Sequence, residues 1–353
     1  MRSKLFVILL IGACSFSCKK KKTPQPEAPQ TLQHGMLVLN EGLFQQNNST
    51  LGWFNFSDNS YTSNFFEQKT NRSLGDTGND MKKYGNKIYV IVNVSSTIEI
   101  LDASTGNSIS QISMIANGTP KQPRYIAFHG PKAYITCYDG YVDVLDTASL
   151  SITGRIPVGA NPEGLAVSNG KLFVANSGGL NFPDVDSTVS VIDLISQVEI
   201  TRITVGKNPG SVQTDVSGDV YVITRGNYAT IPSRMHRINA VSNTLAQSFP
   251  FDASGISRFN NHFLITYHDF SSGENEIALF NPISETIITQ QYISTSGIQT
   301  LYGIHYSDIT NKIYCLDAKN YTVTGQVHVF SSGGIFETSY NVGLNPSKIL
   351  IYD

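Results

Sequence analysis

Seven short segments of the chain share one arrangement of hydrophobic and polar residues. In each segment, a polar or small residue precedes several mostly apolar positions, and a polar residue follows them. The segments are Gly35–Glu41, Lys87–Asn93, Lys132–Tyr138, Lys171–Ser177, Asp219–Arg225, His262–His268 and Lys312–Ala318. A pattern that returns after about 40 residues is typical of β-propellers, in which each repeat forms one blade. Short apolar runs bounded by turn residues also predict strands rather than helices.

A second apolar segment follows each of these after a loop of variable length and ends at an Asp or Asn turn. Examples are Thr97–Asp102, Tyr141–Asp146 and Thr188–Asp193. Their alternating residues would face opposite sides of a sheet, which is the period of two that a strand requires. A tight turn then leads to an outer strand such as Glu199–Val205. Each unit also opens with a short apolar strand after Pro or Gly. Together with the two apolar segments and the outer strand, this makes four strands, so the pattern predicts four-stranded antiparallel blades.

The two ends of the repeat array complete each other. The first unit starts at Met36 without an opening strand, whereas the last opening strand, Pro346–Ile351, has no unit after it. We therefore expect the C-terminal strand to join the N-terminal blade and close the ring, which leaves only short strand edges exposed. The predicted fold class is an all-β, seven-bladed β-propeller. Its blades are expected at 35–67 with 345–353, 79–115, 123–158, 162–205, 209–250, 254–293 and 301–343.

The residues before the repeats are expected to be a targeting signal and a tether. Basic Arg2 and Lys4 precede an apolar run and then two cysteines, which is the pattern of an export signal. The processing site resembles a bacterial lipoprotein signal, with Cys18 as the predicted lipidated residue and Cys14 as the alternative. This divides the chain into a signal peptide at 1–17, a lipidated tether at 18–34 and the propeller at 35–353. An ordinary secretory signal is the alternative interpretation.

Several motifs resemble those of a known family. Leu172–Asn176 and Val205–Pro209 resemble YVTN-type propeller repeats, and Val38–Gly42 with Asn79–Met81 and Tyr84–Tyr89 resembles DUF5074 or YncE-like lipoproteins of Bacteroidetes. Some members of that family assist TonB-dependent transporters, and the best characterised group captures cobalamin with the propeller face. The resemblance therefore implies a propeller that binds a small molecule, with a corrinoid as the first candidate. The identity of the ligand rests on this resemblance alone.

Composition and charge remove several classes of function. The net charge of −2 with only 15% charged residues gives no basic surface, so nucleic acid is not an expected partner. The sequence has no Gly-x-Ser-x-Gly, His-Glu-x-x-His or phosphate-loop motif, and its seven histidines are scattered. We therefore expect no enzyme activity, no cofactor and no metal. Cys137 and Cys315 lie in apolar strands far apart in the repeat order, which predicts buried free thiols rather than a disulfide.

The residues that end the second strand of each unit differ from blade to blade, whereas the structural positions keep their type. These residues are expected on one face of the disc, beside the longest loops and the starts of the innermost strands, where Glu163 also lies. Aromatic rings mixed with charged and amide groups suit a bulky polar ligand. The predicted ligand-binding residues are Glu41, Asn93, Arg124, Tyr138, Asn176, Arg225, Tyr228, Tyr267, His268, Tyr302 and Asp317.

Three functions stay open at this point. The first is a non-enzymatic outer-membrane lipoprotein that captures a small molecule, cobalamin first, for a TonB-dependent transporter. Its partners are the ligand, the transporter and, through the lipid anchor, the membrane. Cell surface and periplasmic face both stay open, and the basic Lys19–Lys22, where surface-displayed members of the family commonly carry acidic residues, favours the periplasmic face. The second is a scaffold or adhesion propeller that binds another protein. The third is a hydrolase or quinoprotein, which the scattered histidines and the single Trp53 disfavour.

Overall fold

The computed structural model describes residues 31–353 except 269–273 and the side chain of His268. The predicted signal peptide, most of the tether, and both Cys14 and Cys18 lie outside the described residues. Thr31–Asp353 forms one compact unit. Across the described residues, no helix is long and apolar enough to cross a membrane.

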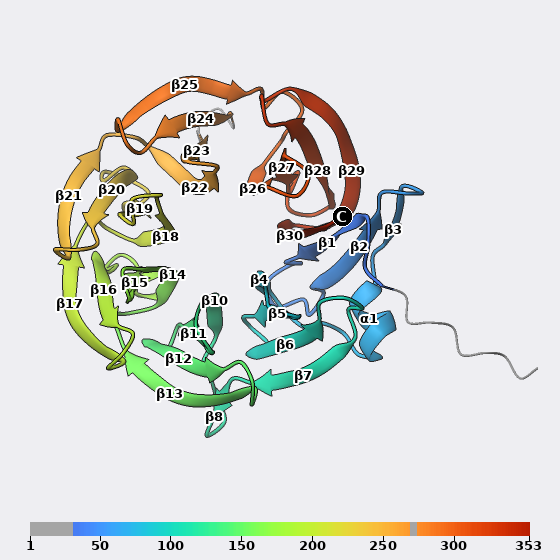
Figure 1. Ribbon diagram of the computed structural model, residues 1–353, viewed down its shortest axis with the longest axis horizontal. Helices are drawn as coiled ribbons and strands as arrows, with labels where there is room; N and C mark the ends of the chain where they lie inside the picture. The colour runs from blue at the N-terminus through green and yellow to red at the C-terminus, as the bar shows by residue number, and fades with distance from the viewer. Residues whose placement is uncertain (1–30, 269–273) are drawn as a thin grey trace, which may run out of the picture. The chain divides into compact units, whose positions relative to one another are not determined.

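Seven four-stranded antiparallel sheets are arranged as blades around a central axis, which confirms the predicted seven-bladed propeller (Figure 1). The four strands of each blade follow one another from the innermost outwards. Blade 1 is β30 (Pro346–Tyr352), β1 (Gly35–Asn40), β2 (Thr50–Asn55) and β3 (Ser60–Thr62), and blade 2 is β4 (Gly78–Tyr84), β5 (Lys87–Val92), β6 (Thr97–Asp102) and β7 (Ser108–Ser113). Blade 3 is β10 (Pro123–His129), β11 (Lys132–Cys137), β12 (Tyr141–Asp146) and β13 (Ser151–Pro157), and blade 4 is β14 (Pro162–Ser168), β15 (Lys171–Asn176), β16 (Thr188–Asp193) and β17 (Val198–Thr204).

The remaining three blades follow the same order. Blade 5 is β18 (Pro209–Thr214), β19 (Val220–Thr224), β20 (Arg234–Asn239) and β21 (Thr244–Phe249). Blade 6 is β22 (Ala253–Phe259), β23 (His262–His268), β24 (Asn275–Asn281) and β25 (Thr286–Ile293). Blade 7 is β26 (Leu301–Ser307), β27 (Lys312–Asp317), β28 (Thr324–Ser331) and β29 (Phe336–Leu344).

The C-terminal strand closes the ring as expected. β30 pairs antiparallel with β1, so that Met36 lies opposite Ile351 and Val38 opposite Ile349. Both ends of the described unit therefore contribute to one sheet, and no separate cap is needed at either end of the repeat array.

The second strand of each blade is buried on both faces, which explains its nearly continuous apolar sequence. In β5, Ile88 and Val90 pack towards blade 1, in a cluster with Leu37. Tyr89 and Ile91, on the opposite face, belong to a cluster with residues of blade 3. The hydrophobic core is therefore a series of layers between neighbouring blades rather than one central mass. Cys137 and Cys315 are buried free thiols within these layers, as predicted.

Two short elements depart from the predicted blade plan. The outer strand of blade 1 is only three residues long and is followed by α1 (Phe65–Thr70), whose Phe65 and Phe66 are buried beside Trp53. The strands of blade 2 end at Ser113, and β8 (Ile115–Ala116) pairs with β9 (Thr119–Pro120) in a separate hairpin. Both additions lie at the outside or edge of the ring and leave the axis unchanged (Figure 1).

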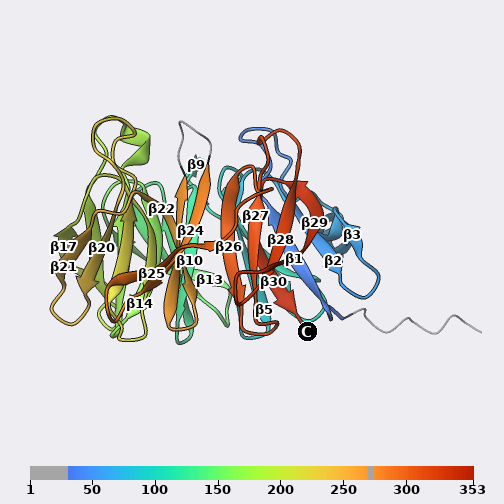
Figure 2. The same cartoon turned by 90° about the horizontal axis from the view of Figure 1, so that it is seen from above.

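The innermost strands begin, and the second strands end, on the same face of the disc. We call this the upper face, because it is at the top in Figure 2. The segments that follow β1, β15, β19 and β27 stand above the strands on this side, and the segment after β15 contains the short helix η1 (Gly179–Asn181). The fold therefore collects the variable ends of different repeats on one surface.

Candidate functional site

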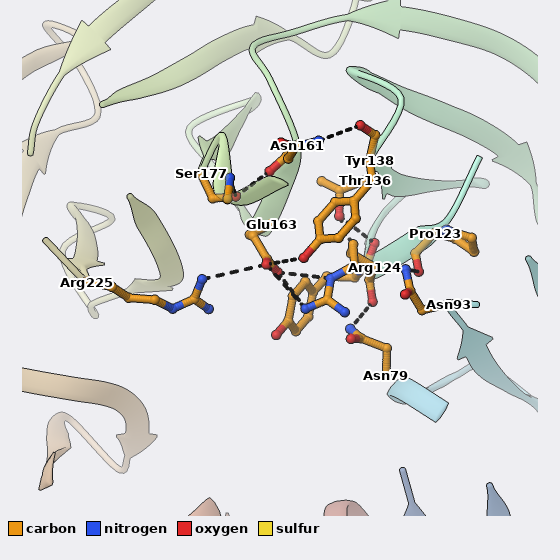
Figure 3. A network of polar contacts seen from close by, with 12 residues as sticks. Asn79, Asn93, Pro123, Arg124, Thr136, Tyr138, Asn161, Glu163, Ser177 and Arg225 are labelled. Carbon is orange, nitrogen blue, oxygen red and sulfur yellow. Dashed lines mark hydrogen bonds and ion pairs between the residues drawn. The ribbon is translucent and has the colours of Figure 1, made fainter. Parts of the chain in front are cut away.

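Charged and aromatic side chains from several blades meet at the centre of the upper face. Glu163 on β14 accepts two hydrogen bonds from Arg124 on β10, with Nε at 3.2 Å and Nη2 at 3.1 Å from Oε2. Tyr138 Oη donates to Glu163 Oε1 over 2.6 Å. Arg225 reaches the same carboxylate from blade 5, with Nη1 at 3.6 Å from Oε1 (Figure 3). One buried carboxylate thus holds two guanidinium groups and a phenol.

A second pair lies beside this network. Tyr302 Oη donates a hydrogen bond of 2.5 Å to Glu41 Oε2, which joins blade 7 to the loop after β1. The Glu41 carboxylate is close enough to Arg124 for the two charges to attract each other, although burial outweighs this attraction and raises the pKa of Glu41. We define the central cluster by its six members, which are Glu41, Arg124, Tyr138, Glu163, Arg225 and Tyr302.

The electrostatics of the central cluster fix its protonation at neutral pH. Burial lowers the pKa of Arg124 and of Arg225, but the combined attraction of Glu163 and the neighbouring acidic and phenol groups leaves both above the ordinary value. Burial raises the pKa of Glu163, yet the charges of the two guanidinium groups and the hydrogen bonds from Tyr138 and Arg124 together lower it further than burial raises it. Burial raises the pKa of Tyr138 and of Tyr302. The two arginines are therefore charged, Glu163 is ionised, and both phenols keep the proton that they donate.

Glycine allows the Arg225 side chain to reach the axis. The guanidinium group crosses the start of β18, where a Cβ on Gly210 would lie 2.6 Å from Arg225 Cζ. A Cβ on Gly164 would in turn lie 2.4 Å from the carbonyl oxygen of Gly210. The innermost strands approach each other so closely here that only glycine leaves room for the neighbouring backbone and for the arginine.

Exposed apolar and aromatic side chains surround the central cluster on the loops of the upper face. Phe182, after β15, and Tyr228, after β19, have ring centroids 6.5 Å apart. Tyr321, after β27, contacts the ring of Tyr302 at 5.8 Å. The exposed members of this aromatic rim are Phe44, Leu180, Phe182, Tyr228 and Tyr321. The face therefore combines a charged centre with an apolar border, and a ligand that covers both would be large and amphipathic.

Three of the predicted ligand-binding residues are instead buried and bind the protein's own backbone or neighbouring side chains. Asn93 Nδ2 donates to the Pro123 carbonyl over 3.1 Å. Asn176 accepts from the Gly159 amide and donates to hydroxyl groups of β16. Asp317 accepts from three backbone amides, among them Thr300. Their position at the end of the second strand was predicted, but their polar groups hold the next loop in place, so we assign them a structural role.

Tyr267 and His268 are not part of the described central cluster. Tyr267 lines a different cavity of about 710 Å³ together with Glu276 and Gln291, within blade 6. The side chain of His268 lies outside the described residues. Tyr228 is on the aromatic rim, where its hydroxyl accepts a hydrogen bond from Asn208 over 3.3 Å. Of the central residues, Glu163 was expected on this face but was not among the predicted ligand-binding residues.

Comparison with known proteins identifies the family. No curated protein matches the sequence. A family model described as a domain of unknown function, DUF5074, matches residues 34–344, which is nearly the whole propeller. The chain belongs to the DUF5074 family. The resemblance seen in the Asn-Glu-Gly opening and the Tyr84–Tyr89 segment is thereby confirmed, and it places the central cluster inside the family domain.

Solved structures resemble this DUF5074 protein in fold. A Quinonprotein alcohol dehydrogenase-like protein from Bacteroides thetaiotaomicron has a TM-score of 0.64 at 15% identity, covering 91% of this chain and 79% of that one. A putative 6-phosphogluconolactonase from Bacteroides uniformis has a TM-score of 0.62 at 12% identity, covering 90% and 99%. Hydrazine synthase from Kuenenia stuttgartiensis has a TM-score of 0.61 at 14% identity, covering 74% and 85%. At these identities the likeness shows the propeller fold alone.

Metal-binding side chains do not gather in the described part of this DUF5074 protein. No group of three or more His, Cys, Asp or Glu residues within it is arranged to hold an ion. Asp186, in the loop after β15, caps the start of β16 by accepting from the amides of Ser187 and Thr188.

Replacing Asp317 with Asn is expected to destabilise the DUF5074 protein by about 1–3 kcal/mol, since hydrogen bonds to a buried charged acceptor contribute this much. Burial raises the pKa of Asp317, but hydrogen bonds from His328, Lys319 and backbone amides hold it below the ordinary value. Ligand affinity should change little, because Asp317 binds backbone amides and no hydrogen bond joins it to a member of the central cluster. Denaturant unfolding and ligand titration measure the two effects, with Asp308→Asn on an exposed turn as control. A loss of affinity without a loss of stability would contradict the structural role.

Proposed function

We propose that this protein is a non-enzymatic binding protein that captures a bulky polar ligand on its upper face, with a corrinoid as the first candidate. The observation that carries this proposal is the central cluster of charged groups surrounded by an exposed aromatic rim. The DUF5074 family has no assigned function, so the choice of a corrinoid rests on the resemblance of the sequence to lipoproteins that capture cobalamin. A corrin ring is broad, flat and edged with amides, which matches a wide face with both kinds of group.

Each part of the face has a role in this capture. The Arg225 side chain is 32% exposed and forms only a loose pair with Glu163, so it can donate hydrogen bonds to amide carbonyls of a ligand. Glu41 can accept from amide N–H groups, since Tyr302 occupies only one of its oxygens. The rings of Phe182 and Tyr228 offer flat apolar surfaces to the macrocycle. Recognition thus relies on groups that the rigid blades hold in place before binding.

The pairing of charges in the central cluster supports binding rather than catalysis. Glu163 is engaged by Arg124, Tyr138 and Arg225, so it is not a free general base. The phenols keep their protons at neutral pH because burial raises the pKa of each. A proton-transfer catalyst needs a group poised near the working pH, and neither Glu163 nor the two phenols meet this need. Glu41, whose pKa burial raises, is held by a hydrogen bond from Tyr302.

The cell envelope is the proposed location. The export signal and Cys18, with Cys14 as the alternative, would tether the propeller to the outer membrane by a lipid. From there it would pass its ligand to a TonB-dependent transporter, on the cell surface or on the periplasmic side. Mass spectrometry of the mature N-terminus tests this part independently, and an unmodified terminus beyond Cys18 would contradict it.

Calorimetric titration of cyanocobalamin into the full chain tests the capture. We expect saturable binding, and Arg225→Met should weaken it by about ten-fold or more, because a charge-assisted hydrogen bond contributes roughly 1.5–3 kcal/mol. Arg202→Met is the matched control, since Arg202 pairs with Glu199 on the outer strand β17. Equal affinity of the two variants would contradict the assignment of the upper face, and haem, siderophores and oligosaccharides should be titrated in parallel.

The aromatic rim also favours a second candidate, a propeller that binds another protein. Large exposed apolar side chains such as Phe44 and Leu180 are typical of protein interfaces when they gather on one surface. This candidate predicts no saturable binding across the small-molecule panel. It also predicts that Phe44→Ser and Leu180→Ser abolish the capture of an outer-membrane partner in a pull-down, whereas Arg225→Met has a smaller effect.

A further inference from the structure

A second cavity lies on the axis of the propeller. It has a volume of about 480 Å³ and is lined by the innermost strands of the blades. Gly164, Gly210 and Gly303 form parts of its wall, and Figure 1 shows β18, β22, β26 and β30 facing the centre of the ring. A water molecule takes up about 30 Å³ in the liquid, so the cavity has room for a small ligand and several waters.

Polar side chains without partners face this cavity from four blades. They are Lys348 on β30, His305 on β26, Gln213 on β18 and Ser257 on β22. None of the four side chains hydrogen-bonds or forms an ion pair with another residue that the structure describes. Lys348 has only a contact with the ring of Tyr125, whose centroid lies 5.7 Å from Nζ. All four are half-buried, so water reaches them, and each has a hydrogen-bond donor free to bind a ligand that enters the cavity.

The charges around the axis leave a positive excess at the cavity, because Lys83, which also lines it, has only a contact with the ring of Tyr352 among the described residues. In the central cluster above, two guanidinium groups are matched by two carboxylates. In the cavity, Lys82 Nζ lies 3.9 Å from Asp80 Oδ2, so this pair is also matched. Lys348 has no carboxylate within ion-pair distance among the described residues. An uncompensated ammonium in a partly buried cavity favours the binding of one negative charge.

We propose that the axial cavity binds one small oxyanion, an inorganic phosphate or a compact carboxylate, on Lys348, with Gln213, Ser257 and His305 as neutral hydrogen-bonding partners. Burial, together with the charge of Lys348, lowers the pKa of His305 to about 4, so its imidazole is neutral at pH 7 and can donate one N–H. Oxyanions suit this set because their oxygens accept from an ammonium, an amide and a hydroxyl at once. This site is separate from the proposed capture of a ligand on the upper face and does not depend on it.

The test titrates phosphate and, separately, acetate into the full chain by calorimetry in a buffer without other oxyanions. Saturable binding of either probe with one site per chain is expected, and the stronger probe identifies the class of oxyanion. Lys348→Gln should weaken this binding by about ten-fold or more, as expected for the loss of a charge-assisted contact. Lys132→Gln, which removes the same charge from the start of β11 away from the cavity, should leave it unchanged.

Several outcomes would overturn the proposal. They are the absence of saturable binding by both probes, or an equal loss in Lys348→Gln and Lys132→Gln, which would indicate non-specific attraction to surface charge. If Lys348→Gln does not fold, Gln213→Leu replaces it and should weaken binding several-fold. Cyanocobalamin titrated into Lys348→Gln separates the two sites, because its affinity should persist there while that for the oxyanion is lost.

Discussion

Replacing Glu163 with Gln is expected to destabilise the propeller by about 3–5 kcal/mol, the usual cost of removing one partner from a buried charge network. The side chain is only 4% exposed and holds Arg124 and Arg225 at once. Without its carboxylate, two positive charges face each other at the axis, and the acceptor of Tyr138 loses its negative charge. Equilibrium unfolding in urea measures the change.

The control for Glu163→Gln is Glu199→Gln. Glu199 forms a two-point pair with Arg202 three residues away on the exposed outer strand β17. The two substitutions remove the same atoms, but the exposed pair should contribute about 0.5 kcal/mol or less. Similar effects of the two substitutions would show that the central cluster contributes no more than a surface pair.

Deleting residues 345–353 is expected to abolish the folded state. This deletion removes β30, so β1 loses its ladder partner on the inner side of blade 1. The buried side chains of Ile349, Ile351 and Tyr352 are lost with it. At about 1.5–3 kcal/mol for each large apolar side chain, the total approaches the whole stability of a typical domain. Near-ultraviolet circular dichroism and size-exclusion chromatography report the result.

Removal of Asp353 alone is the matched control for this deletion. Asp353 is exposed and lies beyond the end of β30. Its loss should leave the thermal transition within about 0.5 kcal/mol, as for an ordinary surface change. A cooperative, monomeric transition in the protein that lacks 345–353 would show that ring closure by β30 is not required.

The blades could be predicted because each second strand is buried on both sides. Ile88 and Val90 must face one neighbouring blade while Tyr89 and Ile91 face the other, so the run cannot alternate with polar residues. The same constraint acts on every repeat, so the apolar run recurs seven times in the sequence and can be recognised. Ring closure could be predicted because the first repeat lacks an opening strand and the last opening strand has no repeat after it.

The short additions could not be predicted in the same way. α1 is six residues long and has no side-chain cap at its start, so it is too short to be stable or recognisable from its own sequence. Its Phe65 and Phe66 are held by packing against Trp53 and Leu74. Each strand of the hairpin of β8 and β9 has only two residues, which is too short to show the alternation of apolar and polar residues that identifies a strand.

The candidate site was predictable in position but not in detail. The register of a meander determines which residues reach the upper face, so Glu41, Arg124, Arg225 and Tyr302 could be assigned to it. Whether a side chain then points to the axis or caps the next loop depends on tertiary geometry. Asn176 shows this, because its amide joins the amide of Gly159 to hydroxyl groups of β16.

Hydrogen–deuterium exchange of the full chain with and without cyanocobalamin tests the central claim most directly. The account predicts slower exchange on the upper face, in the segments at 41–49, 177–187, 225–233 and 318–323. The lower-face turns at 103–107 and 146–150 should exchange at the same rate in both samples. Protection of those lower turns, or no protection by any ligand of the panel, would contradict capture on the upper face.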